Sequence, residues 1–237
     1  MAVLNTILDE RLAVERLRAC PLFAACPDLV LAELGRRLRV RRYARNEVVF
    51  IQGDPGDALH IISSGSVKIV LPSPEGEEAI IATLRAGDFF GELALLDGEP
   101  RSASATAIEA TETLTLPRDS FRELLGRHPS LRDALFASIT GQLRRLTKHV
   151  EELHFLDLAG RLAARLAHLA RQSTPMQTGP ISLDWPYTQT DLAAMIGGTR
   201  QSVNRLLAGL IDDGLVRIER DCLIVPDLDA LERRAER

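Results

Sequence analysis

Short apolar runs separated by turn residues fill the first half of the chain. These runs lie at 48–52, 59–62, 67–71, 79–81, 104–107 and 113–116. Glycine, aspartate and proline at 53–57 mark a turn, and Ser-Ser-Gly-Ser at 63–66 predicts a β-hairpin between the second and third runs. Many short strands at regular intervals indicate an antiparallel sandwich or barrel and disfavour parallel βαβ units.

Apolar residues in the middle of the chain recur at alternating spacings of three and four. They are Phe136, Ile139, Leu143, Leu146, Val150 and Leu153. With Pro129 in the first turn, this pattern predicts a helix of roughly 25 residues, about 38 Å long. The narrow stripe favours pairing with a second copy of the helix, and packing on the chain's own β domain is the alternative.

The last third of the chain predicts a winged helix-turn-helix. Helical patterns at 158–170, 190–196 and 200–212 precede two strand-like runs at 215–218 and 222–225. The apolar residues expected to hold the two helices of the motif together are Leu192, Met195 (or Ile196), Val203 and Leu206. We therefore divide the chain into a β domain (1–128), a dimerisation helix (129–156) and a winged helix-turn-helix domain (157–237).

The composition is that of a globular protein. The 237 residues are 46% hydrophobic and 26% charged, with a formal net charge of -4. An acidic balance argues mildly against a nucleic-acid partner, unless only one face meets DNA. The three cysteines imply no disulfide framework, and the sequence shows neither a secretory signal nor a membrane-length apolar stretch. We expect a cytoplasmic protein that does not enter the membrane.

The segment 87–103 combines residue types that suit a sugar phosphate. A short helix beginning near Gly91 would present unpaired backbone N–H groups to an anion, and glycine allows close approach. Arg101 has a planar fork that matches two phosphate oxygens, and Ser102 adds a donor. Glu92 only accepts hydrogen bonds when ionised, which suits a hydroxyl group. The alternative is that Glu92 and Arg101 simply pair with each other.

The same segment resembles the cyclic-nucleotide-binding cassette of the CRP/FNR (catabolite activator protein) family. The matching positions are Gly91, Glu92, Leu93, Arg101, Ser102 and Ala103, with flanking Gly53-Asp54 and Gly65-Ser66-Val67. The resemblance extends over nearly the whole chain. It implies an α+β fold with an N-terminal β-roll (jelly roll), a long dimerisation helix and a C-terminal winged helix-turn-helix. It also implies that Arg101 and Ser102 bind the cyclic phosphate and that Glu92 binds the 2′-hydroxyl.

The family reads the base with polar residues of the long helix. Counting back from 153–157, these positions fall on Leu146, where the family has threonine, and on Thr147. Thr147 keeps a hydroxyl, and a small helix slip would bring Gln142 or His149 near instead. The expected ligand is cAMP, with cGMP or another cyclic nucleotide as second choice.

The segment 188–207 closely resembles the family's helix-turn-helix. Thr199 suits the N-cap of the second helix, which then exposes Arg200, Gln201 and Arg205 toward base edges in the major groove. Gln201 replaces an acid that is common in the family, so one base pair of the usual half-site is in doubt. The remaining expected contacts go to phosphates and come from Thr188, Gln189 and Ser202. A merely solvated helix face is the alternative.

Other functions find little support. Cys20 and Cys26 cannot supply the four thiolates of an iron–sulfur cluster, the five histidines show no metal-ligand spacing, and enzyme motifs are missing. We therefore expect no catalytic residues and no metal. The prediction is a homodimeric transcription regulator, of the activator type, with a palindromic double-stranded DNA operator and RNA polymerase as partners. The alternative is a CRP/FNR-type regulator that binds DNA without cyclic nucleotide or senses another small ligand.

Overall fold

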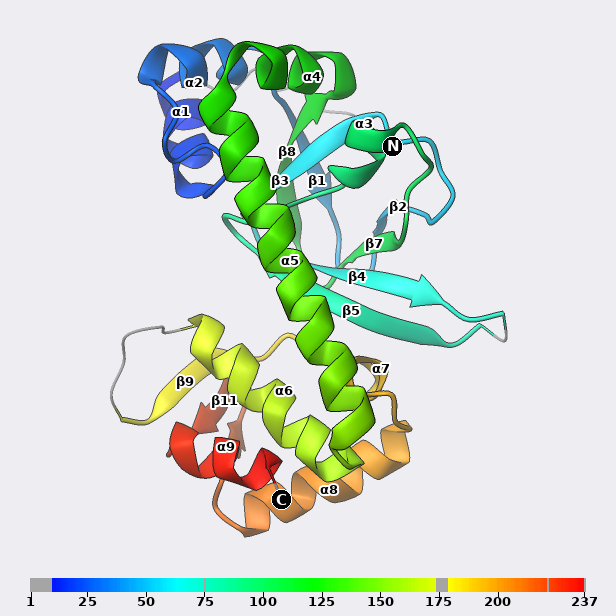
Figure 1. The fold of residues 1–237 in the computed structure, drawn as a ribbon. Helices are drawn as coiled ribbons and strands as arrows, with labels where there is room; N and C mark the ends of the chain where they lie inside the picture. The colour runs from blue at the N-terminus through cyan, green and yellow to red at the C-terminus, as the bar shows by residue number, and fades with distance from the viewer. Residues whose placement is uncertain (1–9, 75, 174–178, 221, 237) are drawn as a thin grey trace. The chain divides into compact units, whose positions relative to one another are not determined.

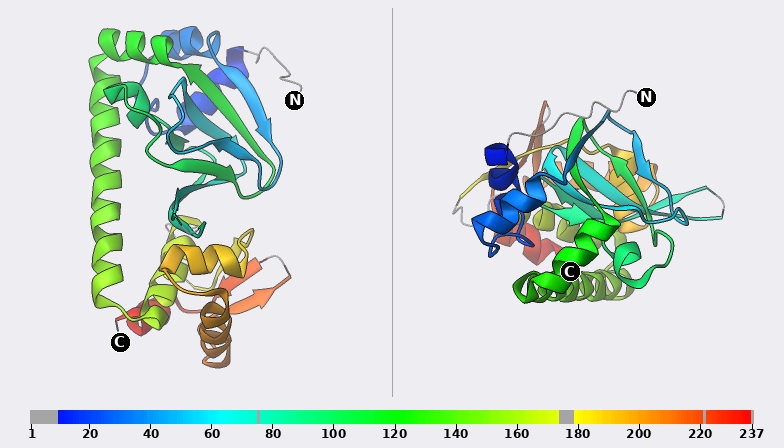
Figure 2. Two further views of the ribbon diagram at one scale, coloured as in Figure 1. Left: turned by 90° about the vertical axis from the view of Figure 1, so that its right-hand side faces the viewer. Right: turned by 90° about the horizontal axis from the view of Figure 1, so that it is seen from above.

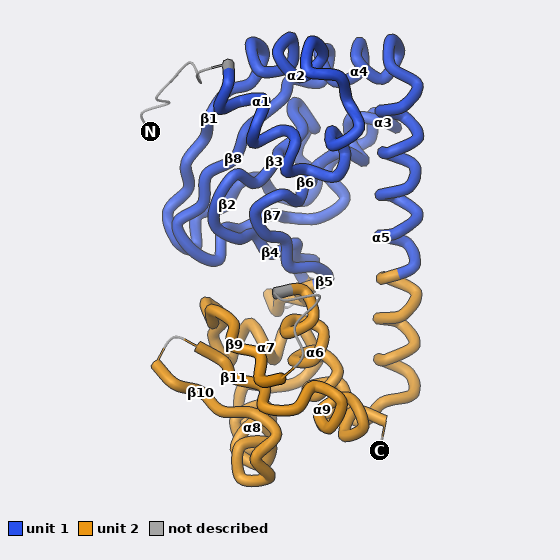
Figure 3. The backbone as a smooth tube through the Cα atoms, turned by 90° about the vertical axis from the view of Figure 1, so that its left-hand side faces the viewer, with its two compact units in different colours: residues 1–72, 81–144 blue, residues 73–80, 145–237 orange. Residues whose placement is uncertain are grey.

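The computed structural model describes residues 10–74, 76–173, 179–220 and 222–236. By its internal contacts the chain divides into two units, drawn in blue and orange in Figure 3. The first comprises residues 1–72 and 81–144, and the second comprises 73–80 and 145–237. None of the described helices combines the length and the apolar character that crossing a membrane requires.

The N-terminal domain contains two four-stranded sheets. In the first, β1 (Arg39–Tyr43), β8 (Thr111–Pro117), β3 (Ala58–Ser64) and β6 (Phe89–Phe90) follow one another in that order. The second has the order β2 (Val48–Phe50), β7 (Ser104–Ala107), β4 (Ser66–Pro72) and β5 (Glu78–Arg85). β8 pairs antiparallel with β1 and β3, and β7 does so with β2 and β4. The predicted antiparallel β architecture within an α+β fold is confirmed.

The hairpin predicted at residues 63–66 is wrong. β3 and β4 follow each other directly in the sequence, but they belong to different sheets. Gly65 between them has a φ of +82°, and a Cβ atom there would lie 2.5 Å from the carbonyl oxygen of Ala110. The chain therefore changes sheets in a tight turn that packs against the start of β8. Its turn residues are of the types that also form hairpins, so the sequence alone does not distinguish the two.

Three helices that the sequence pattern did not reveal gather at one end of the β domain in Figure 1. They are α1 (Glu10–Ala19), α2 (Asp28–Gly35) and α4 (Arg118–Arg127). Their apolar side chains form one core with the first sheet, including Leu17, Leu31, Leu34, Leu59, Leu114 and Phe121. The core of the domain therefore begins well before its first strand.

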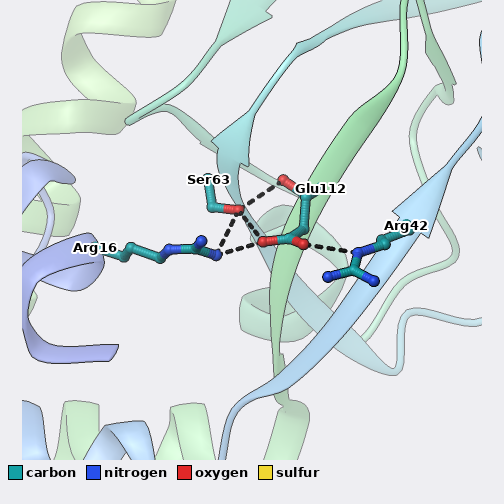
Figure 4. A network of polar contacts seen from close by, with 4 residues as sticks. All are labelled: Arg16, Arg42, Ser63 and Glu112. Atoms are coloured by element: carbon teal, nitrogen blue, oxygen red, sulfur yellow. Dashed lines mark hydrogen bonds and ion pairs between the residues drawn. The ribbon is translucent and has the colours of Figure 1, made fainter. Parts of the chain in front are cut away.

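A polar network around Glu112 attaches α1 to the first sheet (Figure 4). The Glu112 carboxylate accepts hydrogen bonds from Arg16 of α1, from Arg42 of β1 at 2.9 Å, and from Ser63 of β3 at 3.1 Å. These donors hold the pKa of Glu112 below its ordinary value, although partial burial acts in the opposite direction. One carboxylate on β8 thus joins three elements that are far apart in sequence.

The long helix α5 (Pro129–Phe155) runs for 27 residues without a break (Figures 1 and 2). Near its start Leu131 and Leu135 are buried, and Ile139 packs against the core of the N-terminal domain. The rest of the predicted stripe lies on the surface, with exposures of 65% at Phe136, 63% at Leu143, 43% at Leu146, 55% at Val150 and 40% at Leu153. One side of the first turns therefore packs on the chain's own domain, while Phe136 and the stripe from Leu143 onward are exposed.

The second unit contains the predicted winged helix-turn-helix. Its helices are α6 (Leu158–Ser173), α7 (Gln189–Ile196), α8 (Arg200–Asp212) and α9 (Leu228–Ala235). Its sheet has the order β10 (Arg217–Glu219), β11 (Cys222–Val225), β9 (Ile181–Asp184). The sequence pattern revealed neither β9 nor α9. The inner face of α8 is formed by Val203, Leu207 and Leu210, so the prediction of Leu206 as a core residue is wrong by one position.

Candidate functional site

Arg101 is the most enclosed charged residue of the segment that resembles the nucleotide cassette. It is 3% exposed and follows the short helix α3 (Leu93–Asp97). Its Nη1 donates to the carbonyl oxygen of Gly91 at 2.6 Å, and its Nη2 donates to that of Ala58 at 2.9 Å. Its Nε is shielded from solvent and has no hydrogen-bond partner among the described residues. The guanidinium is thus held in place with one buried donor still free.

Gly91 permits this arrangement. Its φ is +83°, and a Cβ atom at this position would lie 2.5 Å from Nη1 of Arg101. Only glycine combines this backbone conformation with such close contact at no steric cost. In the structure the Arg101 guanidinium lies close to Gly91, and the predicted approach of a phosphate to the Gly91 backbone stays a prediction.

Glu92 lies beside Arg101 and is also buried, at 4% exposure. Burial raises the pKa of Glu92, while hydrogen bonds from its own backbone and from Gln142 of α5, together with the charge of Arg101, oppose that rise. The ion-pair partner of Arg101 among the described residues is Asp57, at 3.3 Å, and not Glu92. The alternative of a simple Glu92–Arg101 pair is not what the structure shows. We call Gly91, Glu92 and Arg101 the Arg101 site.

An aromatic cluster supports the guanidinium from one side. Phe50 places its ring centroid 4.2 Å from the central carbon of Arg101, a cation–π contact. His60 stacks on Phe90 with ring centroids 5.0 Å apart and also contacts Phe50. Burial, with Arg101 nearby, lowers the pKa of His60 to about 3. Sequence reasoning missed Phe50, Asp57 and His60, because each lies more than 40 positions from Arg101 and no local motif connects them.

The other predicted ligand residues occupy varied positions. Leu93 is 40% exposed, Ser102 is exposed, and Ala103 is buried. The Ser102 carbonyl accepts a hydrogen bond from the Gln52 side chain at 3.2 Å. Thr147 lies on α5 within the second unit, so its contact with a base stays a prediction.

The two helices of the helix-turn-helix motif begin at well-formed caps. The Thr188 hydroxyl accepts a hydrogen bond from the backbone N–H of Asp191 at 3.1 Å, and the Thr188 N–H donates to the Asp191 carboxylate at 2.9 Å. At α8, the Thr199 hydroxyl accepts from the Ser202 N–H at 3.2 Å, which confirms the predicted N-cap. Gly197 ends α7 in the left-handed conformation, with φ of 68°. These caps fix where each helix starts and hence which side chains face outward.

The side chains predicted to read bases all lie on the surface. Arg200, Gln201 and Arg205 are exposed on α8, and Gln189 is exposed at the start of α7. Ser202 is half-buried and accepts a hydrogen bond from the Thr199 hydroxyl at 3.0 Å. The hydroxyl of Thr188 donates to Asp191 at 2.7 Å, so a phosphate contact from it would compete with the cap.

The three cysteines are free thiols. Cys20 and Cys26 are buried, and burial raises the pKa of the Cys20 thiol to about 12, which makes it unreactive. In the part of the chain that the structure describes, no three His, Cys, Asp or Glu side chains come together as metal ligands do.

Comparison with known proteins identifies the family to which the chain belongs. A cyclic nucleotide-binding domain model matches residues 40–128, and a Crp-like helix-turn-helix domain model matches residues 160–234. A CRP-like cAMP-activated global transcriptional regulator of Mycobacterium tuberculosis is 32% identical over 221 residues, covering 93% of this chain and 99% of that protein. The chain belongs to the CRP family.

Further CRP-family members agree with this placement. The cyclic AMP receptor protein of Thermus thermophilus is 35% identical, over 88% of this chain and 91% of that protein. The solved structure of FixK2 from Bradyrhizobium japonicum matches with a TM-score of 0.73 at 22% identity, over 83% of this chain and 96% of that one. At that identity the likeness shows a common fold. The resemblance inferred from the cassette at residues 87–103 is confirmed at the level of the family.

Proposed function

We propose that this CRP-family protein is a transcription regulator whose binding to DNA is controlled by a cyclic nucleotide, with cAMP as the effector. Two of its relatives are named for cAMP, as an activated regulator and as a receptor. The observation that carries the proposal is the Arg101 site, where a buried guanidinium and a buried carboxylate lie side by side. We expect no catalytic activity and a location in the cytoplasm.

The chemistry of the Arg101 site fits a sugar phosphate. The unpartnered Nε of Arg101 is a charged donor for a phosphate oxygen, and the Ser102 hydroxyl is a second donor. Glu92, when ionised, accepts a hydrogen bond from the ribose 2′-hydroxyl. Gly91 and Leu93 flank Glu92 in the sequence, Ala103 is a buried residue of the same segment, and Thr147 of α5 is assigned to the base. The hydrogen bond between Gln142 and Glu92 gives α5 a direct contact with the ribose-binding carboxylate.

The exposed side chains of α8 suit base edges in the major groove. Arg200 and Arg205 have the geometry to bind guanine, and Gln201 has that to bind adenine. Gln189 and Ser202, with Thr188, are assigned to backbone phosphates, which fix the position of the protein and carry no sequence information.

The exposed stripe of α5 supports a homodimer. Phe136, Leu143, Leu146, Val150 and Leu153 form a line of large apolar side chains on one helix, each at least 40% exposed. Soluble proteins rarely leave such a line uncovered, and its heptad spacing matches that of a two-helix seam. A twofold dimer with recognition helices about 34 Å apart would bind a palindromic double-stranded DNA operator. RNA polymerase is the expected partner at the promoter.

Control by the ligand follows from a population shift. A nucleotide that contacts both the Arg101 site and α5 stabilises the arrangement in which both recognition helices fit the operator. A nucleotide that bound every arrangement equally would leave DNA affinity unchanged.

The experiment is a calorimetric titration of the purified full-length protein with cAMP and then with cGMP. We expect saturable binding of one nucleotide per chain, tighter for cAMP, in wild type and in Arg200→Ala. In Arg101→Gln, affinity should fall about a hundredfold, because a charge-assisted contact to phosphate is lost. If neither nucleotide saturates the wild type, the alternative regulator that acts without cyclic nucleotide replaces this proposal.

A further inference from the structure

The second unit contains a small hollow near the end of α5 that is partly open to solvent. Its lining is formed by His149 and Glu152 of α5, Arg161 and Arg165 of α6, and Met195 and Ile196 of α7. We call it the Arg165 hollow. Three of these six residues are basic types and one is acidic, so the hollow has positive character, although it lies outside the recognition helix.

Arg165, one of the lining residues, has two buried donors. Its Nε and its Nη2 are both shielded from solvent, and neither has a hydrogen-bond partner among the described residues. Buried polar atoms of proteins are nearly always hydrogen-bonded, so two such atoms on one charged group require an explanation. The hydroxyl of Tyr187, close enough to influence the pKa of Arg165, is a third buried polar atom of this kind.

The same helix shows what this edge of an arginine can bind. Arg171, on α6 as well, uses its Nε and Nη2 to hold the two carboxylate oxygens of Glu232 at 2.5 and 2.6 Å. This side-by-side pair of N–H donors matches two oxygens of a carboxylate or a phosphate. Arg165 lines the hollow, and the same pair of its atoms has no such partner among the described residues.

The acidic group of the hollow does not fill this role. Glu152 is 3.8 Å from His149, and hydrogen bonding to His149 is the main reason that the pKa of Glu152 lies below its ordinary value. Arg161 donates from its Nε and Nη1 to the carbonyl oxygens of Leu156 and Ile196. Burial lowers the pKa of Arg165, with Glu152 and Tyr187 opposing. A positive charge therefore remains enclosed here.

We propose that the Arg165 hollow is an anion site, in which Nε and Nη2 of Arg165 bind two oxygens of a carboxylate or a phosphate group. The anion would contact side chains from α5, α6 and α7 together and so connect the end of the long helix with the helix-turn-helix. This site is separate from the Arg101 site and does not depend on the proposed effector.

Trp185 provides a local signal for the test. It is the single tryptophan of the sequence, and its ring meets that of Tyr187 edge-on at 5.2 Å. We would titrate the full-length protein with inorganic phosphate, and separately with acetate, at constant ionic strength while recording tryptophan emission. Saturation by phosphate alone assigns the site to phosphate groups, and saturation by acetate as well assigns it to oxyanions in general.

Variants locate the signal. Arg165→Met should weaken the binding by about tenfold or more, since a charged pair of hydrogen bonds is lost. Arg171→Met, which changes the exposed arginine of the same helix, should retain it, and so should Arg101→Gln. If Arg165→Met does not fold, Arg165→Lys keeps the charge without the paired donors and should also bind more weakly. No saturation in the wild type, or an equal curve in the Arg165 variants, would overturn the proposal.

Discussion

Arg101 is assigned to the phosphate of a small ligand and Arg200 to a base edge of DNA, and the two lie in opposite surroundings. Arg101 is 3% exposed, and two main-chain carbonyls and an aromatic ring determine its position. Arg200 is exposed in the first turn of α8, where a capped helix end fixes only its backbone. A small ligand can be bound by groups that are preorganised inside the protein. Base edges must be reached from outside, so that site keeps its side chains free.

The largest expected effect concerns the exposed region. Arg200→Ala should cost about 1–3 kcal/mol of binding free energy at one base pair in each half-site, because the paired donors to guanine are lost. Stability should change by less than about 0.5 kcal/mol, as for other surface residues. Competition binding with operators that carry single base changes measures this. Arg233→Ala, an equal loss of charge on α9, is the control and should leave discrimination intact.

The next effect concerns the preorganised region. Gly91→Ala should weaken nucleotide binding about a hundredfold and lower the free energy of unfolding by about 3 kcal/mol, since the new Cβ meets Arg101. Gly98→Ala is a matched control, because its φ of +86° is nearly the same but no atom lies within 4 Å of the added carbon. It should cost only the backbone strain, about 1 kcal/mol, and leave affinity unchanged. Equal losses in the two variants would contradict the clash.

A smaller effect should appear in the dependence of stability on pH. The pKa of His60 is about 3 in the folded protein and near 6.5 when exposed, so the unfolded chain takes up the proton first as pH falls. Stability is therefore lost below about pH 6.5, by about 2 kcal/mol at pH 5. Urea unfolding at pH 7 and pH 5 measures this loss. His60→Gln should remove that part of it, and the same slope in the variant would mean that other groups are responsible.

The smallest effect is a dependence of nucleotide affinity on pH, which arises only in the buried Arg101 site. Burial raises the pKa of Glu92, so its carboxylate gains a proton at a higher pH than an exposed glutamate does. Below this pKa, the charged acceptor for the 2′-hydroxyl becomes a neutral carboxyl group, which accepts more weakly, and affinity should fall by up to about tenfold per pH unit. Calorimetry from pH 7.5 to pH 5 checks this. Glu92→Gln should bind more weakly at pH 7.5 and show a flatter profile of affinity against pH. A profile parallel to that of the wild type would mean that Glu92 does not contact the nucleotide.

The sequence predicted those parts of the fold that local patterns determine. β7 matches its predicted bounds, α5 begins at Pro129 and α8 at Arg200, and the Thr199 cap is where helix-start chemistry placed it. The hairpin prediction failed because the chain passes from one sheet to the other at Gly65. Gly65 packs there against Ala110 and Thr111, which are distant in the sequence. α1 and α2 were missed because their apolar side chains form a core only together with the first sheet, which is distant in the sequence.

In the candidate site, too, the sequence predicted the residues of a local motif and missed those that depend on tertiary packing. The cassette motif identified Arg101, Gly91 and Glu92 because these residues lie within eleven positions of one another. It could not show that Asp57, Ala58 and Phe50 determine the position of the guanidinium, since those contacts depend on the packing of two sheets. Nor could it reveal Arg165, because this residue stands out only in the structure. There its buried Nε and Nη2 have no hydrogen-bond partner among the described residues.

The core shared by α1, α2 and the first sheet matters for anyone who wants the sensor domain alone, for instance as a fluorescent reporter. The matched cyclic nucleotide-binding segment begins at residue 40, but Leu17, Phe23, Leu31 and Leu34 are buried against the sheet before that point. A fragment cut at residue 40 would expose their apolar partners to water and would aggregate. Fusion partners should therefore be joined upstream of Glu10, which preserves the Glu112 network as well.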